Sequence, residues 1–290
     1  MGNLLVFRLF CAFLLSVNTL GNLVAQETDS KCINFPLSYR SSRVVGGTNA
    51  EESEFPFIVS LTRRGGHFCG ATIVNDQWLL TAGHCVCNGL NRFMKPNQIK
   101  SVIGLHTMSS FKDNAIESSA FEMNIRTIVT HPDYRCESVK DDIALLRLHK
   151  TIIFTDVVKP ACILSSENNY EGDVAVVSGW GWTMEDQSTG DPANILQKAS
   201  VNVWKNSDCQ KSFREKGSDI ILTENQICAG HVSGGIDSCW ADSGGPLITP
   251  NHSLIGVVST GVGCGRPGLP GIYTRVSKYI NWIKQTIEIK

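Results

Sequence analysis

Three residues of this 290-residue chain could together activate a serine hydroxyl: His84 in LTAGHC, Asp142 in DDIALLRL and Ser243 in ADSGGP. A serine attacks a carbonyl carbon slowly unless a base takes its proton, a carboxylate orients that base, and backbone N–H groups hold the developing oxyanion. Taken singly, each residue also fits an ordinary structural role, such as a partly buried polar residue, a strand end or a turn.

The elements that must position these residues have the pattern of β-strands. Short apolar runs separated by turn residues begin at Phe55 and recur without helical patterns between them: FPFIVSL, HFCGATIV, QWLLTAGHC, IRTIVTH, DIALLRL, DVAVVSGWG, SLIGVVST and GIYTRV. They predict an antiparallel all-β architecture. In VSKYINWIKQTIEI the apolar residues fall at helical spacing, which predicts one closing amphipathic helix around Val276, Tyr279, Ile280, Ile283 and Ile287.

The first 43 residues have a different composition. Arg8 precedes an apolar core from Leu9 to Val17 that is short for a bilayer span, so residues 1–25 are interpreted as a signal peptide, with a buried N-terminal helix as the alternative. Residues 26–43 are polar and end in Ser-Ser-Arg before VVGG, as a linker or pro-segment would. The chain is therefore expected to be secreted, soluble and not membrane-spanning.

Charge and cysteine content narrow the class further. A net charge of −1 gives no electrostatic reason to expect nucleic acid or an anionic membrane as partner. Of the eleven cysteines, Cys11 leaves with the signal peptide, and the remaining even number favours disulfides in an oxidising compartment. Zinc is the competing interpretation, but paired CxxC knuckles and HExxH are absent from the sequence, so no metal is expected.

The ordered segments together resemble the chymotrypsin and trypsin family of secreted serine proteases. The matching segments are VVGG at Val44, WLLTAGHC at Trp78, DIALLRL at Asp142, SGWG at Ser178, ICAG at Ile227, DSGGP at Asp242 and PGIYTRV at Pro270. The resemblance implies that residues 44–290 form a protease domain without a cofactor. Its fold would be two packed six-stranded antiparallel β-barrels with a C-terminal α-helix, with the catalytic residues His84 and Asp142 on the first barrel and Ser243 on the second.

The resemblance also implies a zymogen. A trypsin-like protease would cut after Arg43, and the freed ammonium of Val44 would pair with Asp242 beside the nucleophile. The backbone N–H groups of Ala241 and Ser243 would form the oxyanion hole, where the family usually has glycine in place of Ala241. Implied partners are protein or peptide substrates and protein inhibitors, and the enzyme would be a monomer.

Substrate selection is expected from four residues. Asp237 matches the carboxylate at the floor of the trypsin-like pocket, and Gly261 and Gly271 match the glycines that leave its walls open, which implies cleavage after Arg or Lys. Ser259 would pair its backbone with the extended substrate. Thr260 stands where the family often has tryptophan.

Five disulfides are expected from the same resemblance. Four are matched to family positions, and Cys87–Cys136 follows because these two cysteines remain; the full set is Cys32–Cys162, Cys69–Cys85, Cys87–Cys136, Cys209–Cys228 and Cys239–Cys264. A further family bridge is missing, with Ala175 in place of one half. The trypsin calcium loop is also missing its carboxylates, since Leu105 and His106 occupy that region. Asn251 begins an Asn-His-Ser sequon, so the chain is a candidate glycoprotein.

A second function remains open beside proteolysis. The chain could be a catalytically weak or silent relative that keeps the fold as a binding module, because Ala241 replaces the usual oxyanion-hole glycine. The presence of all three triad residue types favours the enzyme.

Overall fold

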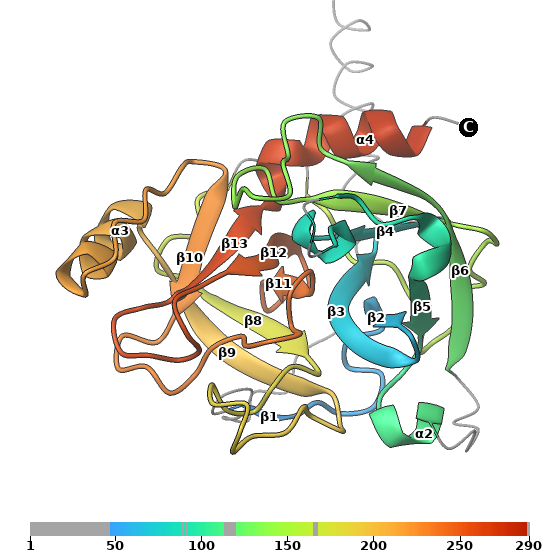
Figure 1. Ribbon diagram of the computed structural model, residues 1–290, viewed down its shortest axis with the longest axis horizontal. Helices are drawn as coiled ribbons and strands as arrows, with labels where there is room; N and C mark the ends of the chain where they lie inside the picture. The colour runs from blue at the N-terminus through green and yellow to red at the C-terminus, as the bar shows by residue number, and fades with distance from the viewer. Residues whose placement is uncertain (1–46, 89, 91, 113–119, 165–167, 289–290) are drawn as a thin grey trace, which may run out of the picture. The chain divides into compact units, whose positions relative to one another are not determined.

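A closed barrel of six antiparallel strands forms the first half of the described chain, in the order β2-β3-β4-β7-β6-β5 (Figure 1). The computed structural model describes residues 47–88, 90, 92–112, 120–164 and 168–288. The expected signal peptide and pro-segment, with Cys32 and Arg43, lie outside these residues, as does Val44. The strands are β2 (Ile58–Arg63), β3 (Gly66–Ile73), β4 (Trp78–Thr81), β5 (Lys100–Ile103), β6 (Phe121–Thr130) and β7 (Ala144–Leu148).

Local sequence explains how this barrel closes. Arg64 and Gly65 join β2 to β3 with φ of 52° and 80°, the left-handed pair that two-residue hairpins favour. Every residue of β4 is buried, and Thr81 at its end pairs with Ala144 at the start of β7. His84 follows this end of β4 by three residues, and Asp142 precedes β7 by two. The two expected catalytic residues are therefore held at neighbouring strand ends.

The second barrel also contains six strands in a closed ring. The order β9-β10-β13-β12-β11-β8 closes through a β8–β9 pairing, and β1 pairs with Gln197 and Lys198 at the start of β9. These strands are β1 (Thr48–Asn49), β8 (Val174–Gly179), β9 (Gln197–Trp204), β10 (Gln226–Gly230), β11 (Pro246–Ile248), β12 (Leu254–Thr260) and β13 (Gly271–Arg275). The two-barrel prediction is confirmed.

The predicted closing helix is present, with its first turn wound more tightly than an α-helix. A 3₁₀ turn over Val276–Tyr279 leads into α4 (Ile280–Glu288). The side chains buried against the barrels are Val276, Tyr279, Ile280 and Ile283. Among the described residues, the α-helices α2 (Met108–Lys112) and α3 (Asn206–Glu215) were not predicted. In α3 only Cys209 and Phe213 are buried, four residues apart, so its periodic signal is weak.

The largest hydrophobic cluster joins the first barrel to the second and to the C-terminal helix, since it contains Leu80, Leu146, Val257 and Ile283 together. Ala175 lies fully buried on β8 in a separate cluster of the second barrel.

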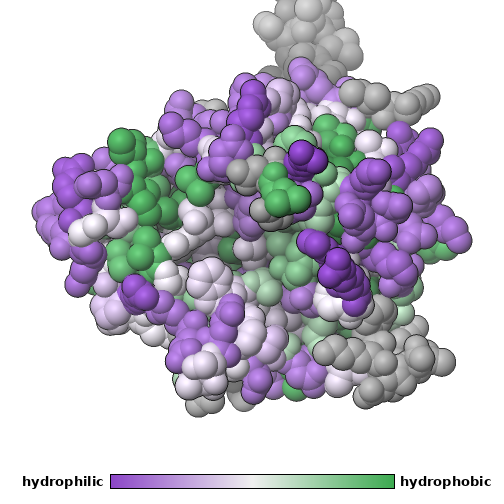
Figure 2. Space-filling model, in the orientation of Figure 1, coloured by the Kyte–Doolittle hydropathy of each residue, from purple (hydrophilic) through white to green (hydrophobic). Residues whose placement is uncertain are grey.

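Hydrophilic side chains cover most of the face shown in Figure 2, with hydrophobic areas beside α3 and near the middle. Within the described ranges, no helix is long and apolar enough to cross a membrane.

Candidate active site

The carboxylate of Asp142 is buried and accepts three hydrogen bonds. Its Oδ2 lies 2.8 Å from His84 Nδ1 and 2.6 Å from the Ser259 hydroxyl, and its Oδ1 accepts the backbone N–H of His84 at 2.8 Å. Because a carboxylate only accepts, Nδ1 of His84 carries a proton and Nε2 faces away as the basic nitrogen. Burial lowers the pKa of His84, but the charge and hydrogen bond of Asp142 outweigh it and raise that pKa above its usual value.

Ser243 lies beside this pair. Its carbonyl oxygen accepts the N–H of Gly70 on β3 at 2.7 Å. The sulfur of Cys85 lies 3.4 Å from the same oxygen and 3.9 Å from His84 Nε2, so the serine backbone and the imidazole touch one common atom. In the described part of the chain the Ser243 hydroxyl has no hydrogen bond to His84, as is frequent in unliganded hydrolases.

Ala241 has a φ of 72°, in the left-handed region that favours glycine. In this conformation the N–H groups of Ala241 and Ser243 donate to no acceptor among the described residues. Two backbone donors near a candidate nucleophile are what an oxyanion requires. The added Cβ costs about 1–2 kcal/mol in this conformation.

A histidine that no sequence motif marks, His67, holds the carbonyl of Ala241. His67 Nε2 lies 3.1 Å from this oxygen, and His67 Nδ1 lies 2.8 Å from the Ser60 hydroxyl. Burial lowers the pKa of His67 to about 4, so the ring is neutral near pH 7. Its Nε2–H therefore donates to the carbonyl, and its Nδ1 accepts from the serine.

Asp237 is 3% exposed and lies among backbone donors. Its Oδ1 accepts the N–H of Ser238 at 2.8 Å, and its Oδ2 accepts that of Gly265 at 3.1 Å. Burial raises the pKa of Asp237 to about 7, although these hydrogen bonds oppose the shift. A Cβ at Gly271 would lie 2.8 Å from Asp237 Oδ1, and one at Gly261 would lie 3.9 Å from the Cα of Gly271. The two glycines thus face each other beside the carboxylate.

Asp242 is buried on the other side of the nucleophile. Its oxygens accept the N–H groups of Gly181, at 2.7 Å, and Cys239, at 2.9 Å. Burial raises the pKa of Asp242 to about 6, and the two hydrogen bonds partly oppose this. Side chains at Gly179 or Gly181 would collide with the carboxylate, which explains the two glycines of SGWG. No cation among the described residues forms an ion pair with Asp242.

A loop from Trp182 to Pro192 borders the segment that carries Ala241. The ring N–H of Trp240 donates to the carbonyl of Glu185 at 3.1 Å, and the Trp240 side chain is 49% exposed. Glu185 in turn forms a two-point ion pair with Arg266 beyond the Cys239–Cys264 disulfide. Three segments around the Asp237 pocket are therefore connected.

Four disulfides match the expected pairs: Cys69–Cys85, Cys87–Cys136, Cys209–Cys228 and Cys239–Cys264. Cys162 is also disulfide-bonded. Its expected partner Cys32 lies outside the described residues. Cys69, His84 and Cys85 gather within 4.8 Å of one another, but the two sulfurs are bonded to each other and are not thiolate ligands for zinc.

The two remaining sequence expectations fall between strands or helices. Leu105 is buried, and the backbone oxygen of His106 accepts the Trp180 ring N–H and the Leu196 backbone N–H. Asn251 is exposed in the turn before β12, where its side-chain oxygen accepts the Thr249 hydroxyl.

Comparison with known proteins agrees with this geometry. The family model described as Trypsin matches residues 44–283. The chain is also similar to the Suppressor of tumorigenicity 14 protein homolog of Bos taurus, with 34% identity over 257 residues. That alignment covers 86% of this chain but 29% of the bovine protein, so the chain spans less than a third of this relative's length.

Proposed function

Because the chain belongs to the trypsin family of serine proteases, we propose that it hydrolyses peptide bonds with Ser243 as nucleophile, His84 as base and Asp142 as orienting carboxylate. The observation that carries the proposal is the threefold hydrogen bonding of Asp142, which holds Nδ1 of the imidazole and leaves Nε2 as the basic nitrogen. A raised pKa of His84 suits a group that must first accept a proton and then return it.

The reaction follows from these positions. Ser243 Oγ bonds to the carbonyl carbon while its proton moves to His84 Nε2, and the carbonyl electron pair moves onto oxygen between the N–H groups of Ala241 and Ser243. The C–N bond then breaks, and His84 protonates the departing amine. Water repeats the sequence on the acyl-enzyme. Each oxyanion donor contributes about 2.7–4 kcal/mol to such a transition state.

Cleavage after Arg or Lys is the proposed specificity. Asp237 offers one buried carboxylate at the base of a space kept open by Gly261 and Gly271. A guanidinium can engage such a carboxylate with two parallel hydrogen bonds, whereas an ammonium contributes one point charge. Ser259 lies on β12, where its backbone can pair with an extended substrate while its hydroxyl remains on Asp142.

Activation is proposed to require the cut between Arg43 and Val44. Asp242 is a buried acid with two backbone donors and, in the described residues, no cation. A new ammonium at Val44 would supply that charge and hold the adjacent Ala241–Ser243 segment in place. The Cys32–Cys162 bridge would then keep the cleaved pro-segment attached.

The proposed setting is extracellular. The apolar segment interpreted as a signal peptide at residues 1–25 and the disulfides support secretion, and the sequon at Asn251 supports glycosylation. The secreted enzyme is proposed to be a monomer. Its partners would be an activating trypsin-like protease, protein or peptide substrates and protein inhibitors.

Covalent labelling distinguishes this enzyme from a silent binding module. Chain cut after Arg43 should react with a fluorophosphonate, whereas uncut chain and a cut Ser243→Ala variant should not. Cut wild-type chain that binds benzamidine, a small aromatic amidinium, but resists the label would instead support the binding module.

A further inference from the structure

Asp141, which precedes the expected catalytic aspartate, has an unusual backbone conformation. Its φ is 53°, and it is one of five non-glycine residues with positive φ in the described chain: Ser53, Arg64, Asp141, Ala241 and His252. A left-handed residue must be held by its surroundings. Aspartate adopts this region more readily than most residues, because its short side chain can hydrogen-bond locally.

The conformation places Asp142 at the centre of a tight turn. The N–H of Ile143 donates to the carbonyl of Asp141 at 2.8 Å, a hydrogen bond that spans only Asp142. The direction in which the Asp142 carboxylate leaves the chain therefore depends on the backbone of Asp141.

The groups that hold Asp141 come from the second barrel and the C-terminal helix, although the residue itself lies on the first barrel. Tyr279 donates its hydroxyl to Asp141 Oδ1 at 2.7 Å, and the Asn225 amide donates to the same oxygen at 3.3 Å. Nearby, Gln226 donates to the Val139 carbonyl at 3.3 Å, and Thr274 donates to the Asp142 carbonyl at 2.8 Å.

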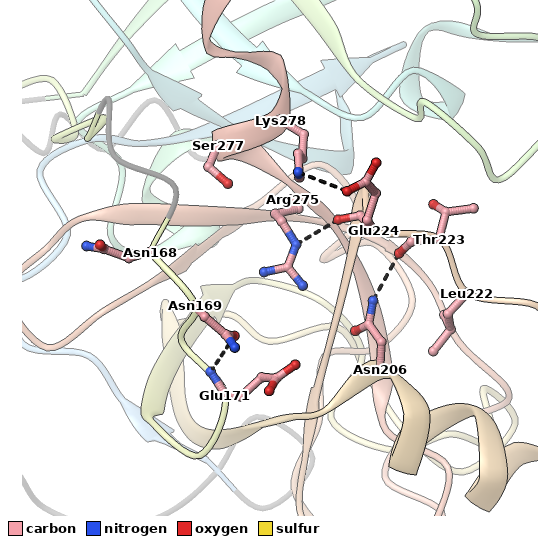
Figure 3. Close-up of a pocket in the computed structure, with 10 residues that line it drawn as sticks. All are labelled: Asn168, Asn169, Glu171, Asn206, Leu222, Thr223, Glu224, Arg275, Ser277 and Lys278. Carbon is pink, nitrogen blue, oxygen red and sulfur yellow. Dashed lines mark hydrogen bonds and ion pairs between the residues drawn. The ribbon is translucent and has the colours of Figure 1, made fainter.

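The second-barrel segment that contacts Asp141 is itself braced, as Figure 3 shows in part. Arg275 donates through its backbone N–H to the Asn225 carbonyl, and through its guanidinium to the carbonyls of Glu224, at 2.9 Å, and Gln226, at 3.0 Å. Lys278 pairs with the Glu224 carboxylate at 3.0 Å. Asn225 and Gln226 therefore face the first barrel from a fixed turn.

We propose that Asp141 is a positioning residue: its side chain fastens the loop of the catalytic aspartate to the second barrel, so that Asp142 meets His84 from one barrel and Ser259 from the other. This inference rests on the proposed function, because it assigns Asp141 a part in aligning the same triad. The anchor fixes the two barrels at the point where the triad crosses between them.

Four variants of the cleaved protease test the anchor. Asp141→Asn keeps the acceptor oxygen and tolerates the left-handed backbone, so kcat should stay within about threefold of wild type. Asp141→Ala still requires the left-handed backbone but lacks the side-chain acceptor that forms the anchor. Asp141→Gly removes both the backbone strain and the anchor. Each should lose at least about tenfold in kcat with little change in KM. Tyr279→Phe should lose less, since the Asn225 amide remains.

A readout of His84 separates positioning from general stability. The pKa of His84, measured by NMR, should fall in Asp141→Ala and Asp141→Gly, because a misplaced Asp142 carboxylate forms a weaker hydrogen bond with the imidazole. In Asp141→Asn this pKa should equal the wild-type value. Asp156→Ala, at a fully exposed acid, is the matched control and should change neither kcat nor this pKa.

Wild-type kcat and His84 pKa in Asp141→Gly would overturn the proposal. If the alanine and glycine variants fail to fold, Tyr279→Phe is the deciding variant. A kcat and a His84 pKa equal to those of wild type in Tyr279→Phe would also overturn the proposal. The NMR titration needs no turnover. A silent wild-type protein would therefore refute the proposed function while the positioning role is still tested.

Discussion

The imidazole of His67 lies 3.1 Å from the carbonyl oxygen of Ala241, so a ring of the first barrel fixes the residue that precedes Asp242 and Ser243 on the second. The ring is neutral because burial lowers its pKa to about 4. In the unfolded chain the same ring would titrate near its ordinary value of about 6.5.

This difference predicts acid sensitivity. Since the folded pKa lies below the unfolded one, the stability contributed by neutral His67 is present above about pH 6.5 and is lost as the pH falls toward about 4. The loss should reach about 3 kcal/mol. Urea unfolding at pH 7.5 and pH 4 should show a larger decrease for wild type than for His67→Gln, which keeps a donor but does not titrate.

Two buried acids act in the opposite direction. The raised pKa values of Asp237 and Asp242 favour their protonated forms in the fold, so their contribution improves as the pH falls. Both acids are present in wild type and in His67→Gln, and the difference between the two proteins isolates the histidine. Equal losses in both would show that His67 is not responsible.

Ala241→Gly tests the strain at the oxyanion hole. Glycine adopts a φ of 72° freely and keeps the N–H. We therefore expect a gain in kcat/KM of less than about tenfold, or about 1.4 kcal/mol, on a small anilide substrate. A folded protein inhibitor should gain more affinity, because removal of the Cβ of Ala241, next to the half-exposed Trp240, would leave more room for a large ligand.

Ser53→Gly is the matched control for Ala241→Gly. It relaxes another left-handed residue, with φ of 62°, at an exposed position outside the site, and should leave kcat/KM unchanged. A gain of a hundredfold or more for Ala241→Gly on the small substrate would mean that the oxyanion hole of the natural chain is broken.

The charge of Asp237 should make ligand binding depend on pH. Because its pKa is raised to about 7, the unliganded pocket is ionised above that pH and becomes neutral below it. Binding of benzamidine should weaken as the pH falls from 8.5 to 5.5. Asp237→Ser should bind weakly throughout and lose about 3 kcal/mol or more of transition-state stabilisation for Arg substrates. Undiminished cleavage after Arg and Lys in that variant would reject the pocket assignment.

Activation should depend on a single arginine of the pro-segment. Trypsin should activate wild type and Arg40→Gln, the matched control three residues earlier, but not Arg43→Gln. The activated product should run as one chain without reductant and release a small fragment with it, because Cys32–Cys162 joins the two parts. Activation of Arg43→Gln would contradict the proposed cut, and fragment release without reductant would contradict the bridge.

Local sequence was sufficient for those parts of the fold where one strand carries its own signal. The runs WLLT and ALLRL are buried almost throughout and became β4 and β7. β9 was not predicted as a strand, although the central residues of QKASVNVW alternate between buried and exposed. The helix α3 was missed because its buried face consists of two residues.

The candidate site also has a part that could be predicted from the sequence and a part that could not. Its residue types are recognisable along the chain, but the contacts that support them are not. His67 and Ala241 are 174 positions apart, and Ser259 and Asp142 are 117 apart. Such pairs meet because two barrels pack against each other, and neither hydrophobic periodicity nor spacing encodes that packing. The left-handed backbone of Asp141 depends on partners in the second barrel for the same reason.

The largely exposed loop from Trp182 to Pro192 contains neither lysine nor arginine. Loops of this kind are where proteases usually nick a folded protein. With the proposed specificity for Arg and Lys, another activated copy of this chain would find no residue in the loop that suits Asp237. Concentrated preparations should therefore resist self-digestion at this loop, and its Trp240 and Arg266 contacts should persist for as long as the enzyme stays folded.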